Sequence, residues 1–88
     1  MTTKTVALVT GGVGGIGSAV CKELAQKKYQ VIAGYHPAEE TNARAKLKEW
    51  QAEGINIDIV SGDVASFASS AEMARNIRQK FGTVQVLV

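Results

Sequence analysis

The sequence has no long hydrophobic run, a single cysteine and little excess of charge, and each shortage excludes a class of protein. The apolar run that follows residues 1–4 is too short for a signal peptide or for a membrane span. Cys21 has no second cysteine with which to form an internal disulfide, which agrees with a reducing compartment. A formal net charge of +2 on scattered lysines gives no reason to expect nucleic acid as a partner. We therefore expect a cytoplasmic protein that binds neither a membrane nor nucleic acid.

What is present fits one small globular domain. The chain has 88 residues, of which 45% are hydrophobic, and this composition excludes a disordered chain and suffices for one core. No repeat, linker or low-complexity segment divides it. We expect Cys21 to be a packed helix cysteine rather than a reactive thiol, because no neighbour in the sequence would activate it.

The stretch from Thr5 to Leu24 organises the rest of the chain. Residues 6–9 form a short run rich in β-branched side chains, which is typical of a buried parallel strand. Five glycines follow within residues 11–17, and after them the apolar residues recur with the period of a helix. The chain must turn sharply from strand to helix here, and glycine permits both positive φ angles and close approach of another group to the backbone. Because the first N–H groups of a helix have no partner inside it, a phosphate can bind directly to this turn.

Apolar periodicity predicts the remaining elements. Further strands are expected at 30–33, 55–60 and 84–88, a second helix from 39, and a third from Ser66 or, alternatively, from Ser69. The predicted buried stripes of the three helices are Ile16, Ala19, Val20 and Leu24; Ala43, Leu47 and Trp50; and Phe67, Ala71, Ala74, Ile77 and Phe81. Residues 34–37 are predicted to be a loop, because Pro37 disfavours helix at the residue before it. Gly54 and Gly82 are expected where the second and third helices end.

The alternation β-α-β-α-β-α-β predicts an α/β fold, a Rossmann-like doubly wound parallel sheet. The expected strand order is 3-2-1-4, which places the topological reversal between strands 1 and 4, beside the glycine turn. A flavodoxin-like order, 2-1-3-4, is the alternative. Strand 84–88 would lie at an edge with its outer backbone unpaired, and we expect the isolated chain to self-associate or to be only marginally folded.

Two kinds of phosphate site use glycines in this arrangement. Gly12, Gly14 and Gly17 satisfy the dinucleotide pattern G-x-G-x-x-G, in the required position between a strand and a helix. A P-loop would need a lysine directly after the last glycine, and Ser18 stands there instead. The turn therefore predicts a dinucleotide rather than a nucleoside triphosphate.

Two motifs carry a family resemblance, Thr10-Gly11-x-x-x-Gly15-Ile16-Gly17 and Gly62-Asp63-Val64. With them, the whole chain resembles the N-terminal part of the short-chain dehydrogenase/reductase family, nearest to its acetoacetyl-CoA and 3-oxoacyl reductase branch. The resemblance implies that Asp63 meets the adenine amino group and that the backbone of Val64 helps to hold the ring. The residues expected to bind the coenzyme are Gly11, Gly12, Val13, Gly14, Gly15, Ile16, Gly17, Tyr35, Arg44, Gly62, Asp63 and Val64.

NADP is the expected coenzyme. An NAD site usually has an acid about twenty residues beyond the glycines, on the ribose hydroxyls. The strand at 30–33 is instead followed by Gly34, Tyr35 and His36, so no carboxylate repels a 2′-phosphate there. Arg44 is the nearest arginine, and it is equally explained as a solvated helix residue. His36 is the nearest possible cation, and it is better explained as a plain loop residue. Tyr35 either packs on the adenosine or covers the end of its strand.

The catalytic residues that the family uses are missing from this chain. The family places a serine and a Tyr-x-x-x-Lys pair at the reacting carbonyl, and no Tyr-x-x-x-Lys occurs here. We expect residues 1–88 to be the N-terminal dinucleotide-binding portion of a larger single-domain reductase, with no catalytic residue and no metal site of its own. The resemblance implies that the parent is a homotetramer that reduces a 3-oxoacyl thioester. A non-catalytic nucleotide-binding half-domain and a response-regulator-like signalling domain are the alternatives.

Overall fold

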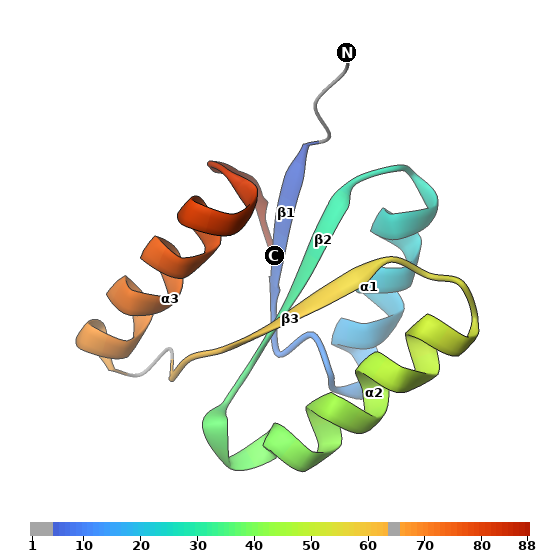
Figure 1. Cartoon of the computed structure of the whole chain (residues 1–88), viewed down its shortest axis with the longest axis horizontal. Helices are drawn as coiled ribbons and strands as arrows, with labels where there is room; N and C mark the ends of the chain where they lie inside the picture. The colour runs from blue at the N-terminus through green and yellow to red at the C-terminus, as the bar shows by residue number, and fades with distance from the viewer. Residues whose placement is uncertain (1–4, 64–65) are drawn as a thin grey trace.

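A computed structural model describes residues 5–63 and 66–88, which form a parallel sheet with helices on both faces (Figure 1). The strands are β1 (Val6–Thr10), β2 (Gln30–Tyr35), β3 (Ile57–Ser61) and β4 (Val84–Leu87). The helices are α1 (Gly15–Gln26), α2 (Glu40–Ala52) and α3 (Phe67–Phe81), and a short 3₁₀ helix, η1 (Pro37–Glu39), leads into α2. The α/β alternation predicted from the sequence is confirmed.

The strand order is β3-β2-β1-β4, with all neighbouring strands parallel. This confirms the predicted order and excludes the flavodoxin-like alternative. Thr10 pairs with Gly34, and Tyr35 pairs with Ser61, so β1, β2 and β3 end at the same edge of the sheet. The turn after β1 and the loop after β3 therefore both start at that edge, and β1 also borders the point between β1 and β4 where the strand order reverses.

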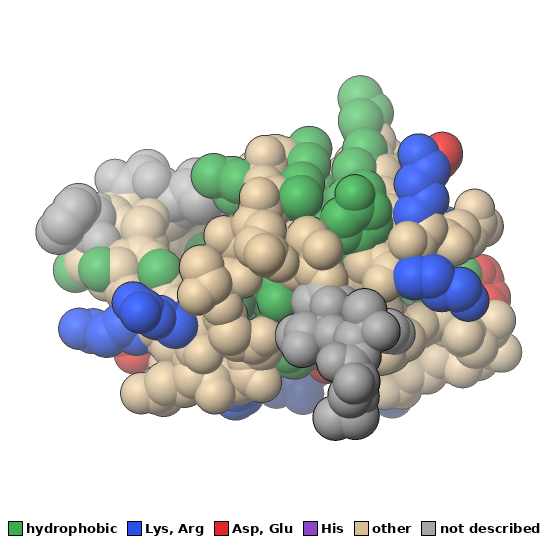
Figure 2. All heavy atoms as spheres, turned by 90° about the horizontal axis from the view of Figure 1, so that it is seen from above, with side chains coloured by type: hydrophobic (Ala, Val, Ile, Leu, Met, Phe, Trp, Pro, Cys, Tyr) green, Lys and Arg blue, Asp and Glu red, His purple; other side chains and the backbone are tan. Residues whose placement is uncertain are grey.

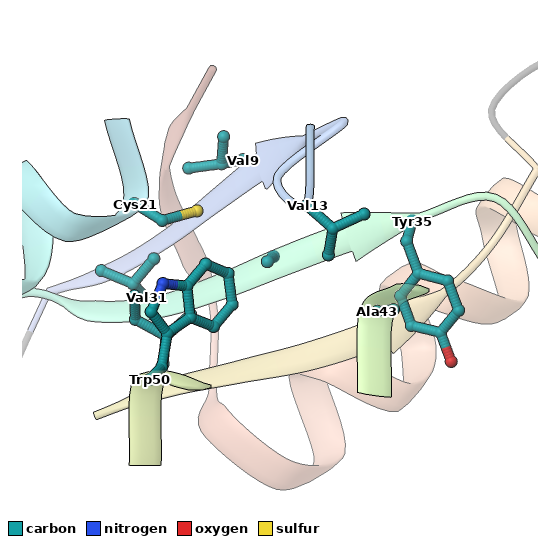
Figure 3. Packing of buried hydrophobic residues seen from close by; sticks show 9 residues of the cluster. Val9, Val13, Cys21, Val31, Tyr35, Ala43 and Trp50 are labelled. Carbon is teal, nitrogen blue, oxygen red and sulfur yellow. The ribbon is translucent and has the colours of Figure 1, made fainter. Parts of the chain in front are cut away.

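The core has two halves, one on each face of the sheet. Helices α1 and α2 cover one face and α3 covers the other (Figure 1). On the α1 and α2 face, Trp50 is fully buried and its indole ring lies beside Val31 and below Cys21 (Figure 3). On the α3 face, Met73 and Ile77 pack with Val6 and Ile32. Alternate residues of β2 thus pack into opposite halves of the core, as expected for a strand buried on both faces.

The predicted buried stripe of α1 is partly wrong. The side chain of Ile16 is 86% exposed and Ala19 is exposed, whereas Ser18 and Cys21 are the buried residues of this helix. Val20 and Leu24, also predicted, do pack partly against the core. The rotation of α1 is set where Gly17 lies against the backbone of the preceding turn, and this contact directs Ile16 toward solvent.

The inner face of α3 also differs from the prediction at one position. Ala74 is exposed, and Met73 is buried in its place, one turn before the correctly predicted Ile77. The helix begins at the earlier of the two predicted starts, because the Ser66 hydroxyl accepts a hydrogen bond from the N–H of Ser69 at 3.3 Å. The side chain of Phe67 lies outside the part of the chain that the structure describes.

Other boundaries shift by a few residues. β2 continues through Gly34 and Tyr35, which were predicted to be loop, since both pair with β3. In α2 the stripe is confirmed, with Ala43 and Trp50 buried and Leu47 half-buried. Gly54 and Gly82 follow their helices with positive φ angles of 75° and 98°, as their predicted places require.

β4 forms one edge of the sheet in the described residues, and its end is exposed. Leu87 and Val88 are 70% and 52% exposed. Seen from above, hydrophobic side chains reach the surface of the molecule between groups of lysine and arginine (Figure 2). No helix among the described residues combines the length and the apolar character needed to cross a bilayer.

Candidate coenzyme-binding site

The turn between β1 and α1 is held by its own backbone and by β2. Gly11 has a φ angle of 64°, which a residue with a side chain rarely adopts, and its carbonyl accepts a hydrogen bond from the N–H of Gly14 at 3.1 Å. The N–H of Gly12 donates to the carbonyl of Gly34 at 3.0 Å, which ties the turn to the end of β2. The turn is therefore fixed before any ligand arrives.

Two of its glycines are required by packing. A Cβ atom at Gly12 would lie 2.6 Å from the Cβ atom of Ala33 and 2.8 Å from its Cα atom. A Cβ atom at Gly17 would overlap the carbonyl oxygen of Gly11. Both contacts involve parts of the chain that cannot move away, so these glycines allow helix, turn and strand to approach closely.

Gly15 and Gly14, in contrast, border open space. A Cβ atom at Gly15 would meet nothing within 4 Å, and one at Gly14 would meet only the Gly11 carbonyl oxygen, at 3.4 Å. In the described part of the chain, the N–H groups of Gly15, Ile16 and Gly17 have no hydrogen-bond acceptor. Three unused donors at the positive end of a helix dipole fit a diphosphate, and no protein atom within 4 Å requires glycine at position 15.

A small pocket of about 150 Å³ lies beside this turn, where the first three strands end. It is lined by Thr10, Gly11, Gly34, Tyr35, His36, Glu39, Gly62 and Met73. Gly62 closes onto α3, since a Cβ atom there would overlap the side chain of Met73. Asp63 stands next to the pocket, with its carboxylate oxygen Oδ2 3.6 Å from Nε2 of His36. Its backbone N–H donates to the hydroxyl of Ser69 at 2.8 Å, which fixes the loop after β3 to α3.

The comparisons with known proteins decide the family. The family described as "short chain dehydrogenase" matches residues 5–88. The chain belongs to the short-chain dehydrogenase/reductase family. It is 42% identical over 83 residues to an acetoacetyl-CoA reductase of Allochromatium vinosum, covering 94% of this chain and 34% of that protein. A second acetoacetyl-CoA reductase, of Cupriavidus necator, is 36% identical over 87 residues, with 98% of this chain and 35% of that protein covered.

Solved structures agree with this family. A variant of actinorhodin polyketide ketoreductase, crystallised with NADPH, superimposes with a TM-score of 0.85 at 31% identity. The match covers 99% of this chain and 33% of the ketoreductase. The chain thus spans about a third of the length of the relatives and structures that it matches.

The structure of this family member brings together several of the predicted site residues. Gly11, Tyr35 and Gly62 line the pocket, Asp63 stands at its rim, and the exposed residues 14–16 and the half-buried Gly17 lie at the start of α1. The side chain of Ile16 is 86% exposed, and its N–H group is one of the unused donors. Val64 lies outside the described residues.

The side chains of two predicted residues, Val13 and Arg44, lie away from the pocket, and that of a third, Tyr35, is nearly buried at its wall. The side chain of Val13 is 6% exposed and belongs to the core, so any ligand contact would come from its backbone. Tyr35 is 7% exposed and lies beside Ala43 (Figure 3), which favours the alternative that it covers the end of its strand. Arg44 is not part of the pocket, and its guanidinium lies 3.7 Å from the carboxylate of Glu40 on the surface of α2.

Glu39 was missed by the sequence analysis, which assigned it only to the opening of the second helix. It lies in η1 and lines the pocket together with His36. A signal for this turn was present, because Pro37 favours the first position of a helix and His36 can cap it. His36 does so through Nδ1, which accepts the N–H of Ala38 at 3.0 Å.

Cys21 takes no part in the site, as predicted. It is fully buried, and its thiol donates to the carbonyl of Gly12 at 3.7 Å. Burial raises the pKa of the Cys21 thiol to about 11, so the thiolate that a nucleophile needs does not form at neutral pH. The cysteine supports the glycine turn from below.

Proposed function

We propose that this chain is the coenzyme-binding part of an NADP(H)-dependent reductase that converts a 3-oxoacyl thioester to the 3-hydroxyacyl product. The observation that carries the proposal is the set of unused N–H groups of Gly15, Ile16 and Gly17, at the reversal between β1 and β4. Ligands of open α/β sheets bind at such a reversal, and a diphosphate satisfies donors at a helix start. The coenzyme, when bound, would supply the hydride that such a reduction needs.

The substrate class rests on the relatives. Both acetoacetyl-CoA reductases match nearly the whole of this chain, at 42% and 36% identity. The residues described here provide the coenzyme side of the site, so substrate specificity and a homotetrameric assembly of the parent belong to the proposal. The choice of NADP is supported by Tyr35 and His36, which stand where an NAD site usually has an acid, and by the NADPH carried by the matching ketoreductase.

The residue roles follow from the geometry. Gly14 to Gly17 would hold the diphosphate through main-chain N–H groups, and Gly11 and Gly62 would border the adenosine side. Asp63 would accept a hydrogen bond from the adenine amino group through its carboxylate. We propose this role for the carboxylate in the position that the structure gives it, beside His36. Val64 is proposed to support the adenine ring through its backbone.

Two measurements test the proposal. Titration of the full-length protein with NADPH in a calorimeter should show saturable binding at one site per chain. Mixing it with acetoacetyl-CoA should then consume NADPH, followed as loss of absorbance at the reduced nicotinamide band. Binding without consumption of NADPH with any 3-oxoacyl thioester would favour the alternative, a non-catalytic nucleotide-binding module. Absence of binding would reject both.

A further inference from the structure

The charges around the pocket at the strand ends come from three side chains. His36 and Glu39 line the pocket, and Asp63 lies at its rim. His36 and Glu39 belong to one turn, since His36 caps η1 and Glu39 ends it, whereas Asp63 comes from the loop after β3. The fold brings Asp63 to this turn, and the balance of the three charges sets the electrostatic potential that a ligand meets there.

His36 is fixed in one tautomer and is directed at Asp63. Its Nδ1 atom accepts the N–H of Ala38 at 3.0 Å, so a neutral imidazole carries its proton on Nε2. Nε2 lies 3.6 Å from the Asp63 carboxylate, and this carboxylate offsets any positive charge that His36 acquires. His36 is therefore not an independent cation available to a ligand phosphate.

Glu39, in contrast, has no neutralising partner near it. Within residues 5–63 and 66–88, no lysine, arginine or histidine lies within ion-pair distance of its carboxylate. The nearest arginine in the sequence, Arg44, is engaged by Glu40 at 3.7 Å. The wall of the pocket therefore carries a negative charge, although no acid follows β2 directly.

The backbone explains why Glu39 reaches the pocket. Its N–H donates to the carbonyl of His36 at 2.8 Å, which closes a single tight turn directly after β2. Pro37 begins this turn, and the ring of His36 caps it. The turn folds the chain back toward the strand ends and places Glu39 on the wall of the pocket. In the sequence, only Tyr35 and His36 stand directly at the end of β2.

NADP and NAD differ only by a phosphate on the 2′-oxygen of the adenosine ribose. A carboxylate accepts hydrogen bonds from a ribose hydroxyl and repels a phosphate dianion. We propose that Glu39 sets the coenzyme selectivity of this protein, by weakening the binding of the 2′-phosphate so that NADH remains a usable coenzyme beside NADPH. This inference rests on the proposed nicotinamide-binding function and concerns the selection between the two coenzymes.

The test compares dissociation constants for NADPH and NADH by calorimetry in three proteins, the wild type, Glu39→Gln and Glu49→Gln. Glu49 is the matched control, because its removal changes the net charge equally, on the surface of α2 and away from the pocket. Glu39→Gln should tighten NADPH about five- to tenfold relative to NADH, and Glu49→Gln should change this ratio by less than about twofold. Raising the salt concentration should shrink the effect of Glu39→Gln.

The opposite results separate this inference from the proposed function. If Glu39→Gln changes the ratio of the NADPH and NADH dissociation constants no more than Glu49→Gln does, Glu39 does not select the coenzyme. The proposal that the protein binds a coenzyme would still stand. If the wild type prefers NADPH over NADH by about a thousandfold or more, Glu39 does not oppose the phosphate. If the wild type binds neither coenzyme, the proposed function fails, and the inference fails with it.

Discussion

A Cβ atom at Gly12 would lie 2.6 Å from the Cβ atom of Ala33, because the turn after β1 rests directly on β2. The same turn leaves open space at Gly15, only three residues further along the chain. One glycine-rich motif therefore contains two kinds of glycine, those that the fold requires and those that a ligand would require. Substitutions at the two kinds of position should have opposite effects on stability and on coenzyme binding.

The substitution Gly12→Ala should destabilise the fold by about 2 kcal/mol, because the added methyl group forces the turn away from β2. The change is measured as the shift in a urea unfolding curve followed by the fluorescence of Trp50, the single tryptophan of the chain. Gly15→Ala is the matched control, and its unfolding free energy should change by less than about 1 kcal/mol. Equal losses in the two variants would contradict the distinction.

The substitution Gly15→Leu should leave the fold intact and weaken coenzyme binding. The added side chain meets no protein atom near its Cβ, and it would occupy the space beside the unused N–H groups of α1. We expect the dissociation constant for NADPH to rise at least about tenfold, equivalent to about 1.4 kcal/mol. Ala19→Leu adds comparable bulk on the exposed face of the same helix and should have no such effect. An unchanged constant in Gly15→Leu would remove the diphosphate from this turn.

Stability should fall as the pH rises from about 9 to about 11, because burial raises the pKa of Cys21 from 9.0 to about 11. In this window the unfolded chain loses the thiol proton and the folded chain keeps it. The free energy of unfolding therefore falls as the pH rises. The loss should be on the order of 2 kcal/mol. Unfolding free energies measured across this range for the wild type and for Cys21→Ala check it, since the variant lacks this contribution. Parallel pH profiles of the two proteins would refute the assignment.

The isolated chain of 88 residues should self-associate through the edge that β4 presents. Its outer backbone is unpaired within the described sheet, and Leu87 and Val88 are largely exposed beside it. Sedimentation velocity should show a mass that grows with concentration. Leu87→Lys should shift this equilibrium toward the monomer by about tenfold or more, whereas Ala74→Lys, on the exposed face of α3, should not. A wild-type chain that stays monomeric at high concentration would refute this.

Much of the fold could be read from the sequence because it depends on local patterns. The alternation of apolar runs and helical periods predicted the strands and helices, and the right-handed connection of parallel strands left few possible orders. The two errors in the buried stripes concern the rotation of helices. Ile16 and Ala74 fit an apolar stripe by their spacing, yet both are exposed, because the close contact at Gly17 and the burial of Met73 fix how α1 and α3 face the sheet.

By itself the sequence determined the glycine turn, the class of ligand that unused N–H groups favour, and the order of the sheet. The reason is that a strand, a glycine turn and a helix start are encoded by neighbouring residues. Only the tertiary structure decided which side chains surround the proposed binding site. It buried Val13, kept Arg44 out of the pocket, and placed Asp63 beside His36. These relations join residues from separate turns and strand ends, where small differences in backbone direction, invisible to spacing rules, decide which charges meet.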